Sequence, residues 1–231
     1  MSGCPDCDHA ESPTPVTATP ASSTEVLIHA AALDRLLMLL LLPPDPHRPA
    51  ALRELAPALE PELRDFAIAA ADQGAGALQA EYHVLLGFSG LVPTCESDLG
   101  DGVMRKASSI PDVAGFYRAF SWAPAELRDS PDHIASELGF ASWLALKQAA
   151  AQDAGNADAT AVTAEARDAF EREHLGPFGA RLAERLLAVA PDGSLFAHVA
   201  ALLALRCQLP DMTGEGRDGR GEGGSSTGAT S

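Results

Sequence analysis

Residues 130–138 read SPDHIASEL, and they join a helix start to three clustered ionisable side chains. The hydroxyl of Ser130 is a preferred N-cap, and Pro131 fits the first helical position, where no backbone donor is needed. Asp132 complements the positive end of the helix dipole. The pattern predicts a helix over residues 131–152.

Three polar groups gather at the start of this predicted helix. His133 and Glu137 are four residues apart and share a face, while Asp132 lies on the neighbouring strip. We interpret this patch as the place of function. A simpler interpretation stays open, in which Asp132 serves only the helix dipole and His133 and Glu137 form a solvated pair.

The composition predicts an all-α fold. The chain has 231 residues, of which 46% are hydrophobic, so it is long enough for one substantial core. Ala and Leu dominate, aromatic residues make up only 5%, and no segment alternates apolar and polar residues as a half-buried strand would. A helical bundle follows from these properties.

The two ends differ in composition from the middle. Residues 1–24 are rich in Pro, Ser, Thr and Ala, and residues 210–231 are rich in Gly, Ser and Thr. Such segments bury too little apolar surface to offset chain ordering, so we predict disordered tails. Residues 25–209 form the predicted helical domain, and a polar stretch at 153–160 allows two lobes with a hinge there.

Prolines, glycines and capping residues delimit the predicted helices. Gly74 and Gly76 weaken the middle of the third one, a long irregular loop is expected over 88–109, and Gly176-Pro177 predicts a helix break. The predicted helices span residues 25–42, 50–55, 61–86, 112–120, 131–152, 164–175, 178–189 and 194–209.

The charge balance restricts the partners. Asp and Glu number 32 against 16 Lys and Arg, a formal net charge of −16, so nucleic-acid phosphates and anionic lipids are repelled. The apolar run at 36–42 is shorter than the roughly 20 residues that span a bilayer, which predicts no membrane insertion. A cationic ligand is favoured by the negative field, although acidity that serves only solubility is the open alternative.

The cysteines do not indicate a disulfide framework. Cys4, Cys7, Cys95 and Cys207 lack the spacing of a disulfide scaffold, and no secretory leader precedes Cys4, so we expect a cytoplasmic protein. Cys4 and Cys7 belong to a predicted disordered tail or, alternatively, to half of a metal site that lacks further ligands. We predict no metal site and no resident cofactor.

Four short motifs in matching order identify a family. The resemblance rests on these motifs: EYHVLLG at 81–87, VPTCES at 92–97, VAGFY at 113–117 followed by PDH at 131–133 with EL at 137–138, and FEREHLGPF at 170–178. Together they resemble the TorD/DmsD/NarJ-like family of redox-enzyme maturation chaperones, over roughly residues 26–209. The chain departs from the usual family pattern at Thr94-Cys95 and at Phe178, where Trp is common.

The resemblance implies a TorD-like helical bundle and a chaperone instead of an enzyme. Its implied partner is the apo catalytic subunit of a molybdopterin oxidoreductase, held through a twin-arginine signal peptide until the cofactor is inserted. It also allows binding of a guanine nucleotide or of the molybdenum cofactor. The chain is expected to be a monomer or, because of the polar hinge at 153–160, an exchange-linked dimer. The predicted client-binding residues are Asp132, His133, Glu137, Glu96, Ser97, Tyr117 and Tyr82, with Phe116 as a further groove or core aromatic.

Two other functions remain as alternatives. One is a helical metal-dependent hydrolase or sensor, whose metal ligands would be His133, Glu137, Asp132 and His174. The sequence contains no H-E-x-x-H motif that would support it. A purely structural helical adaptor is the other alternative. No phosphate-binding loop, dinucleotide fingerprint or nucleophile elbow occurs in the chain, so the sequence offers no catalytic motif.

Overall fold

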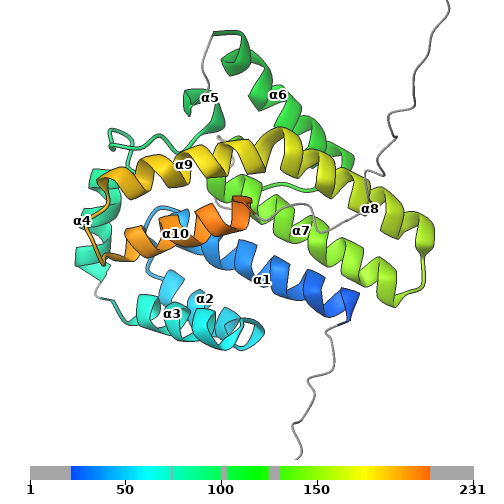
Figure 1. Cartoon of the computed structure of the whole chain (residues 1–231), viewed down its shortest axis with the longest axis horizontal. Helices are drawn as coiled ribbons and strands as arrows, with labels where there is room; N and C mark the ends of the chain where they lie inside the picture. The colour runs from blue at the N-terminus through cyan, green and yellow to red at the C-terminus, as the bar shows by residue number, and fades with distance from the viewer. Residues whose placement is uncertain (1–21, 74, 100–102, 125–130, 209–231) are drawn as a thin grey trace, which may run out of the picture.

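The computed structural model describes residues 22–73, 75–99, 103–124 and 131–208, and within them it contains helices and no β-strand (Figure 1). This confirms the predicted all-α class. The elements are α1 (Ser23–Leu41), α2 (Arg48–Leu55), η1 (Ala56–Ala58), α3 (Pro61–Asp72), α4 (Ala75–Leu85), α5 (Glu96–Leu99), α6 (Val103–Ala119), α7 (Ile134–Asp153), α8 (Ala157–Phe170), η2 (Glu171–Leu175), α9 (Gly176–Val189) and α10 (Leu195–Gln208).

The first helix, α1, runs through the middle of the bundle. It starts with a capping box, in which the Ser22 hydroxyl accepts from the amide of Glu25 and the Glu25 carboxylate accepts from the amide of Ser22. Its leucine run from Leu36 to Leu41 is buried, and the Ser142 hydroxyl of α7 donates to the carbonyl of Ala31 at 2.9 Å. Residues 22–24 therefore belong to the folded domain and not to the predicted N-terminal tail; the rest of both predicted tails, with Cys4 and Cys7, lies outside the described residues.

The helix predicted over residues 61–86 is two helices in the structure. Helix α3 ends at Asp72 because Gln73 takes extended backbone angles (φ −67°, ψ 137°), and α4 starts at Ala75. Gly74 lies outside the described residues and Gly76 belongs to α4, so the helix is interrupted after Asp72, where the sequence predicted only a weakening.

The segment predicted as a long irregular loop over residues 88–109 contains helical structure. The short helix α5 occupies its middle, and α6 already begins at Val103. The predicted helix start at residue 112 is therefore wrong, and Pro111 lies inside α6. A proline lacks one amide donor, and here that loss does not end the helix.

Helix α7 begins three residues later than predicted. Its first residue is Ile134, and the N-cap is His133, whose ring Nδ1 accepts from the amide of Ala135 at 3.1 Å. Pro131 and Asp132 precede the helix, and the proposed cap Ser130 lies outside the described residues. Residues 133 and 95 instead pair as an isolated antiparallel bridge, so a tertiary contact fixes where the helix starts.

Helices α8 and α9 are continuous with each other. Helix α8 begins at Ala157 with Asn156 as its N-cap, which reduces the polar linker predicted at 153–160 to a short turn. The predicted break at Gly176-Pro177 is wrong, because the chain passes from α8 to α9 through η2, a wide π-helical turn. Proline fits directly after this turn, at the start of α9, where its missing amide costs little.

The core combines leucines of α1 with an aromatic cluster between α6, α7 and α8. Phe140 lies at its centre, with ring centroids 4.8 Å from both Tyr117 and Phe170 and 5.5 Å from Trp122. Both Phe140 and Phe170 are completely buried. No helix in the described part of the chain is long and apolar enough to cross a membrane.

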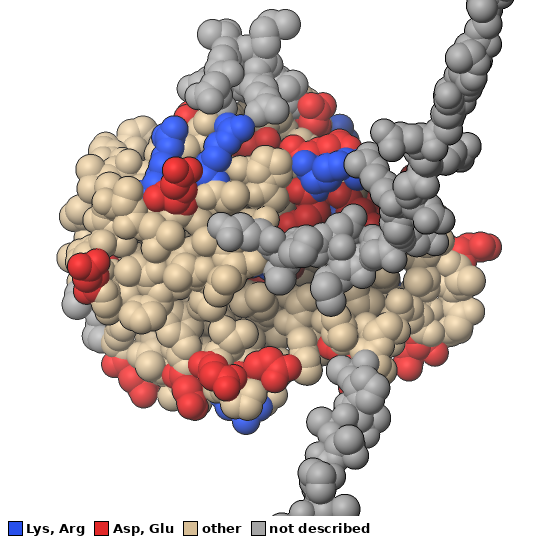
Figure 2. All heavy atoms as spheres, in the orientation of Figure 1, with Lys and Arg blue, Asp and Glu red and all other residues tan. Residues whose placement is uncertain are grey.

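The surface reflects the acidic composition. Figure 2 shows acidic side chains along the lower edge of the molecule, where α2 and α3 lie in Figure 1. The exposed acids of this region are Glu54, Glu60, Glu62, Asp65 and Asp72.

Candidate binding pocket

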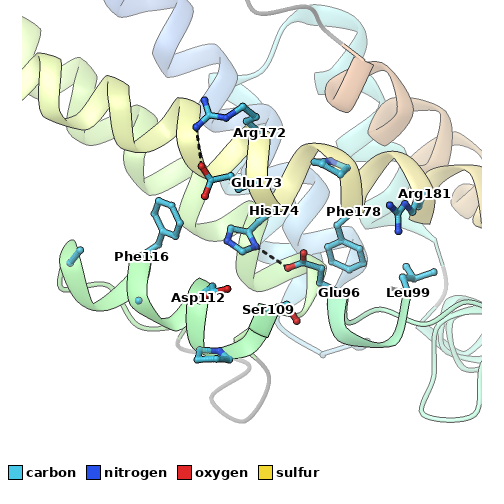
Figure 3. A pocket seen from close by; sticks show the side chains of 14 residues that line it. Glu96, Leu99, Ser109, Asp112, Phe116, Arg172, Glu173, His174, Phe178 and Arg181 are labelled. Atoms are coloured by element: carbon cyan, nitrogen blue, oxygen red, sulfur yellow. Dashed lines mark hydrogen bonds and ion pairs between the residues drawn. The ribbon is translucent and has the colours of Figure 1, made fainter. Parts of the chain in front are cut away.

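The candidate site is a cavity of about 800 Å³ between α5 and α6 on one side and η2 and α9 on the other (Figure 3). This volume lies in the range of pockets that hold small ligands or peptide side chains. The lining residues are Glu96 and Leu99 of α5, Ser109, Pro111, Asp112, Gly115, Phe116 and Ala119 of α6, Arg172, Glu173 and His174 of η2, and Pro177, Phe178 and Arg181 of α9.

Two aromatic rings form the apolar part of the wall. Figure 3 shows Phe116 and Phe178 on opposite sides of the pair Glu96 and His174. Leu99 lies on the side of Phe178, next to Arg181. The pocket therefore offers apolar surface on both sides of a polar centre.

A carboxylate and an imidazole meet at the polar centre. His174 Nδ1 lies 3.0 Å from Glu96 Oε2, and the His174 side chain is buried. The imidazole ring also packs edge-on against Phe116, with centroids 5.6 Å apart. Because a carboxylate accepts hydrogen bonds, Nδ1 carries the hydrogen in this pair, which fixes the tautomer of the ring.

The π turn η2 carries His174 and presents it to Glu96. In η2 the amide of Gly176 donates to the carbonyl of Glu171, five residues earlier, so the turn is wider than an α-helical one. A Cβ on residue 176 would lie 2.7 Å from that carbonyl oxygen, so only glycine fits. Turns of this kind are rare and often occur at functional sites.

Asp132 positions the opposite wall. Its Oδ2 accepts from the amide of Ser97 at 3.0 Å, and its carbonyl accepts from the amide of Glu96 at 2.9 Å. The amide of Ile134 donates to the carbonyl of Thr94 at 2.9 Å, which completes the bridge between the two segments. Asp132 thus caps α5 from another part of the chain and holds Glu96 at the pocket.

The residues of the predicted polar patch are buried. Asp132 is 2% exposed, His133 6% and Glu137 0%, so the alternative of a solvated pair is wrong. Burial lowers the pKa of His133 to about 4, although the charge of Asp132 acts in the opposite direction. His133 is therefore neutral at physiological pH, which leaves Nδ1 free to act as the helix cap.

Glu137 is a buried acid without a partner in the described part of the chain. Neither carboxyl oxygen has a hydrogen-bond partner there. Burial, and then the nearby charges of Glu96, Asp132 and Glu171, raise its pKa well above the ordinary value. The Glu137 carboxyl group is therefore protonated over a wide pH range, in the interior of the protein.

The two tyrosines belong to the core. The Tyr117 hydroxyl donates to the carbonyl of Pro131 at 2.7 Å, and burial raises its pKa. Tyr82 is also buried, and burial raises its pKa to about 12. Both hydroxyls are thus neutral, and both rings pack against phenylalanines of the core.

Among the described residues that line the cavity, Glu96 and Phe116 are the ones that the sequence predicted. The other predicted client-binding residues do not line the cavity. Tyr82 belongs to α4, and the rest lie behind the cavity wall or away from it: Ser97, Asp132, His133, Glu137 and Tyr117. Their part in client binding stays a prediction. The residues that sequence reasoning did not assign to a client site are His174, Asp112, Arg172, Glu173, Arg181 and Phe178; His174 and Phe178 stand in the last of the recognised motifs.

The metal-site alternative finds no support in the geometry. No group of three or more His, Cys, Asp or Glu side chains in the described residues is placed to hold a metal ion. Two of the nitrogens that the alternative needs already have partners, since His133 Nδ1 accepts from the amide of Ala135 and His174 Nδ1 is bonded to Glu96.

Comparison with known proteins identifies a family. Residues 46–184, more than half of the chain, match the family described as nitrate reductase delta subunit. The matched segment includes every residue of the pocket. No curated protein and no solved structure matches the chain. This chain, with its pocket between α6 and the π turn, therefore belongs to the nitrate reductase delta subunit family, the NarJ/TorD-type family of molybdoenzyme chaperones.

Proposed function

We propose that this protein binds the apo catalytic subunit of a molybdopterin oxidoreductase in the cytoplasm, through the subunit's twin-arginine signal peptide. It holds the subunit until the cofactor is inserted. Membership of a molybdoenzyme chaperone family supports a molybdoenzyme catalytic subunit as the partner. The molybdenum cofactor enters this proposal as the group that the client receives, and no reaction is assigned to the chaperone.

The composition of the pocket is the observation that carries the proposal. A signal peptide joins a basic end to an apolar segment. The pocket places the carboxylates of Glu96 and Asp112 beside the rings of Phe116 and Phe178. Carboxylates pair with arginine guanidinium groups, and the aromatic walls accept apolar side chains, so both parts of such a peptide find complementary surface.

The net charge of the chain has the sign that attracts a basic peptide. The chain carries a formal net charge of −16, and of the two lining arginines Arg172 is paired with Glu173 at 2.9 Å. Behind the pocket, the guanidinium of Arg206 contacts two carboxylates, Asp34 and Glu171. A negative field raises the local concentration of a basic peptide and speeds its association.

Co-purification followed by peptide binding tests the proposal. The tagged protein is recovered from the cytoplasm of its own source, and the proteins bound to it are identified by mass spectrometry. We expect a molybdoenzyme catalytic subunit that retains its leader. A synthetic peptide of that leader is then titrated by fluorescence anisotropy, alongside one with both arginines replaced by glutamine and one with the apolar segment replaced by serines.

Matched substitutions locate the binding site. Glu96→Gln with Asp112→Asn removes two charges from the pocket at almost constant shape. Glu62→Gln with Asp65→Asn makes the same chemical change on exposed positions of α3. We expect the first pair to weaken binding of the twin-arginine peptide by about tenfold, equivalent to about 1.4 kcal/mol, and the second pair to leave it unchanged.

The outcomes separate the function from the site. Recovery of no molybdoenzyme subunit, or equal affinity for all three peptides, contradicts the proposed function. Specific binding that both substituted pairs leave unchanged keeps the function and contradicts this pocket. Recovery of a partner without a leader peptide favours the adaptor alternative.

A further inference from the structure

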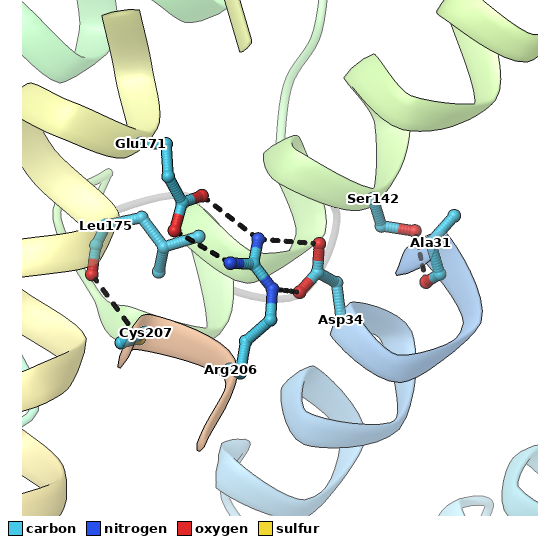
Figure 4. A network of polar contacts seen from close by, with 7 residues as sticks. All are labelled: Ala31, Asp34, Ser142, Glu171, Leu175, Arg206 and Cys207. Atoms are coloured by element: carbon cyan, nitrogen blue, oxygen red, sulfur yellow. Dashed lines mark hydrogen bonds and ion pairs between the residues drawn. The ribbon is translucent and has the colours of Figure 1, made fainter. Parts of the chain in front are cut away.

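A partly buried ion cluster joins three distant parts of the chain behind the pocket (Figure 4). The Arg206 guanidinium of α10 contacts Asp34 of α1, with Nε 2.6 Å from Oδ1 and Nη2 3.2 Å from Oδ2. The same group contacts Glu171 of η2, with Nη1 2.7 Å from Oε1 and Nη2 3.0 Å from Oε2. Arg206 is thus bidentate to both carboxylates at once.

The neighbouring residue touches the other end of the π turn. The thiol of Cys207 lies 3.9 Å from the carbonyl oxygen of Leu175, the last residue of η2. Helices α9 and α10 approach closely at this point, because a Cβ on Gly179 would lie only 2.5 Å from the Cys207 sulfur. The C-terminal end of α10 therefore contacts the first and the last residue of the π turn.

A π turn needs such support. Its backbone geometry is less favourable than that of an α-helix, which is why π-helices are rare and short. Glu171 supplies both the carbonyl that closes the wide ring and the carboxylate that Arg206 holds. The same turn presents His174 to Glu96 in the pocket.

We propose that the end of α10 holds the π turn in place, and that Arg206 is thereby a positioning residue for the pocket, acting through Glu171 on His174. As far as the pocket is the client site, this inference rests on the proposed function. Arg206 and Asp34 both lie outside residues 46–184, so the family match does not include the support that we assign here.

The chemistry of the cluster requires arginine. A planar guanidinium offers five donors in a fixed arrangement, which serves two carboxylates simultaneously. A lysine keeps the charge but has one nitrogen and cannot bridge both groups in this geometry. Arg206→Lys therefore loosens Glu171 while it leaves the formal charge unchanged.

The experiment measures the tautomer of the His174 ring, because the hydrogen bond to Glu96 fixes which ring nitrogen carries the hydrogen. Ring nitrogen NMR shifts at neutral pH, assigned with a His174→Gln variant, show whether Nδ1 carries the hydrogen. We expect that signature in the wild-type protein and its loss in Arg206→Lys, together with an about tenfold weaker affinity for the leader peptide. Arg53→Lys is the matched control, since Arg53 pairs with Asp72 at the exposed surface of α2 and α3.

A second variant covers the case in which Arg206→Lys does not fold. Asp34→Asn with Glu171→Gln and Arg206→Met removes every charge of the cluster, and neutral replacement of a buried ion cluster is often tolerated. We expect this triple variant to fold and to lose the Nδ1 signature as well. In the wild-type protein, hydrogen exchange gives a further readout, because the Gly176 amide must be protected if the π turn is held.

The results distinguish this inference from the proposed function. A folded Arg206→Lys or triple variant with the wild-type His174 signature overturns the inference, and so does a Gly176 amide that exchanges as fast as an exposed loop amide. If the signature changes as expected but no leader peptide binds the wild-type protein, the positioning role of Arg206 stands and the proposed function falls.

Discussion

Asp132 and Ser97 are joined by a hydrogen bond of 3.0 Å, in which the backbone amide of Ser97 donates to the carboxylate of Asp132. The bond fixes the first turn of α5 to the segment in front of α7. It explains how a buried acid, 2% exposed, contributes to a pocket that it does not line.

Replacement of Asp132 is expected to reduce both stability and client affinity. Asp132→Ala leaves the Ser97 amide unpaired in a partly buried position, which costs about 1–3 kcal/mol of unfolding free energy. Asp132→Asn keeps an acceptor oxygen and loses less. Urea denaturation measures both variants, and an alanine variant as stable as the wild type contradicts the anchoring role of Asp132.

Glu137 makes stability fall as the pH rises. The folded state holds the proton of Glu137 to a pH well above the unfolded value of 4.5, because burial raises its pKa. Between these two pKa values the folded state binds more protons, so the unfolding free energy declines by up to about 1.4 kcal/mol per pH unit for this group. Below pH 4.5 the contribution is complete.

Glu137→Met tests this dependence. The variant removes an unpartnered carboxyl from the core, so we expect about 1–3 kcal/mol more stability at neutral pH and a flatter decline above pH 4.5. Asp34, whose pKa burial also raises, is present in both proteins, and the difference between them isolates Glu137. Parallel pH profiles of the two proteins would show that Glu137 ionises as readily in the folded state as in the unfolded chain.

His133 acts in the opposite direction on the acid side. Its pKa is about 4 in the folded protein and 6.5 in the unfolded chain, so the unfolded state binds more protons between these values. Stability from this group is complete above pH 6.5 and is lost as the pH falls toward 4, by on the order of 3 kcal/mol in total.

His133→Asn separates the cap from the titration. Asparagine is a strong N-cap and does not ionise, so the variant retains the start of α7 at pH 7. We expect its stability relative to the wild type to increase steadily from pH 6.5 to pH 4 in thermal or urea unfolding. A constant difference over this range would mean that His133 takes up its proton as readily in the folded protein as in the unfolded chain.

The close approach of α9 and α10 predicts a compensating pair of substitutions. Gly179→Ala introduces a Cβ only 2.5 Å from the Cys207 sulfur, and overpacking of this kind costs about 1–3 kcal/mol. Cys207→Ala removes the sulfur, so the double variant should recover most of that loss. Unfolding free energies of the four proteins form a double-mutant cycle, and purely additive effects would contradict the contact.

Local chemistry made several parts of the fold predictable. The prolines after Leu42 end α1 as predicted, and the Ser194 hydroxyl accepts from the amide of Ala197 at the start of α10. These signals act within a few residues, so the sequence around each of them is sufficient. The motifs also led to Glu96, which lies on the pocket wall.

Contacts between distant residues decided what the sequence did not show. The start of α7 depends on the pairing of residues 133 and 95, and the burial of Glu137 depends on the packing of α7 against its neighbours. The path through Gly176-Pro177 depends on Arg206, thirty residues further along the chain. A local pattern of glycine and proline predicts a break, and only the tertiary contact turns it into a continuous helix.

The π turn also fixes the register between two helices. A turn with one additional residue advances every later side chain by about 100° around the helix axis, since an α-helix has 3.6 residues per turn. Phe178, Leu182 and Leu186 of α9 are buried only with that advance. Deletion of a single residue from 171–175 would restore an ordinary helix and keep this row of side chains on the core side, whereas closing the turn without a deletion would rotate the row by about 100°, so the π turn compensates for one additional residue in the chain.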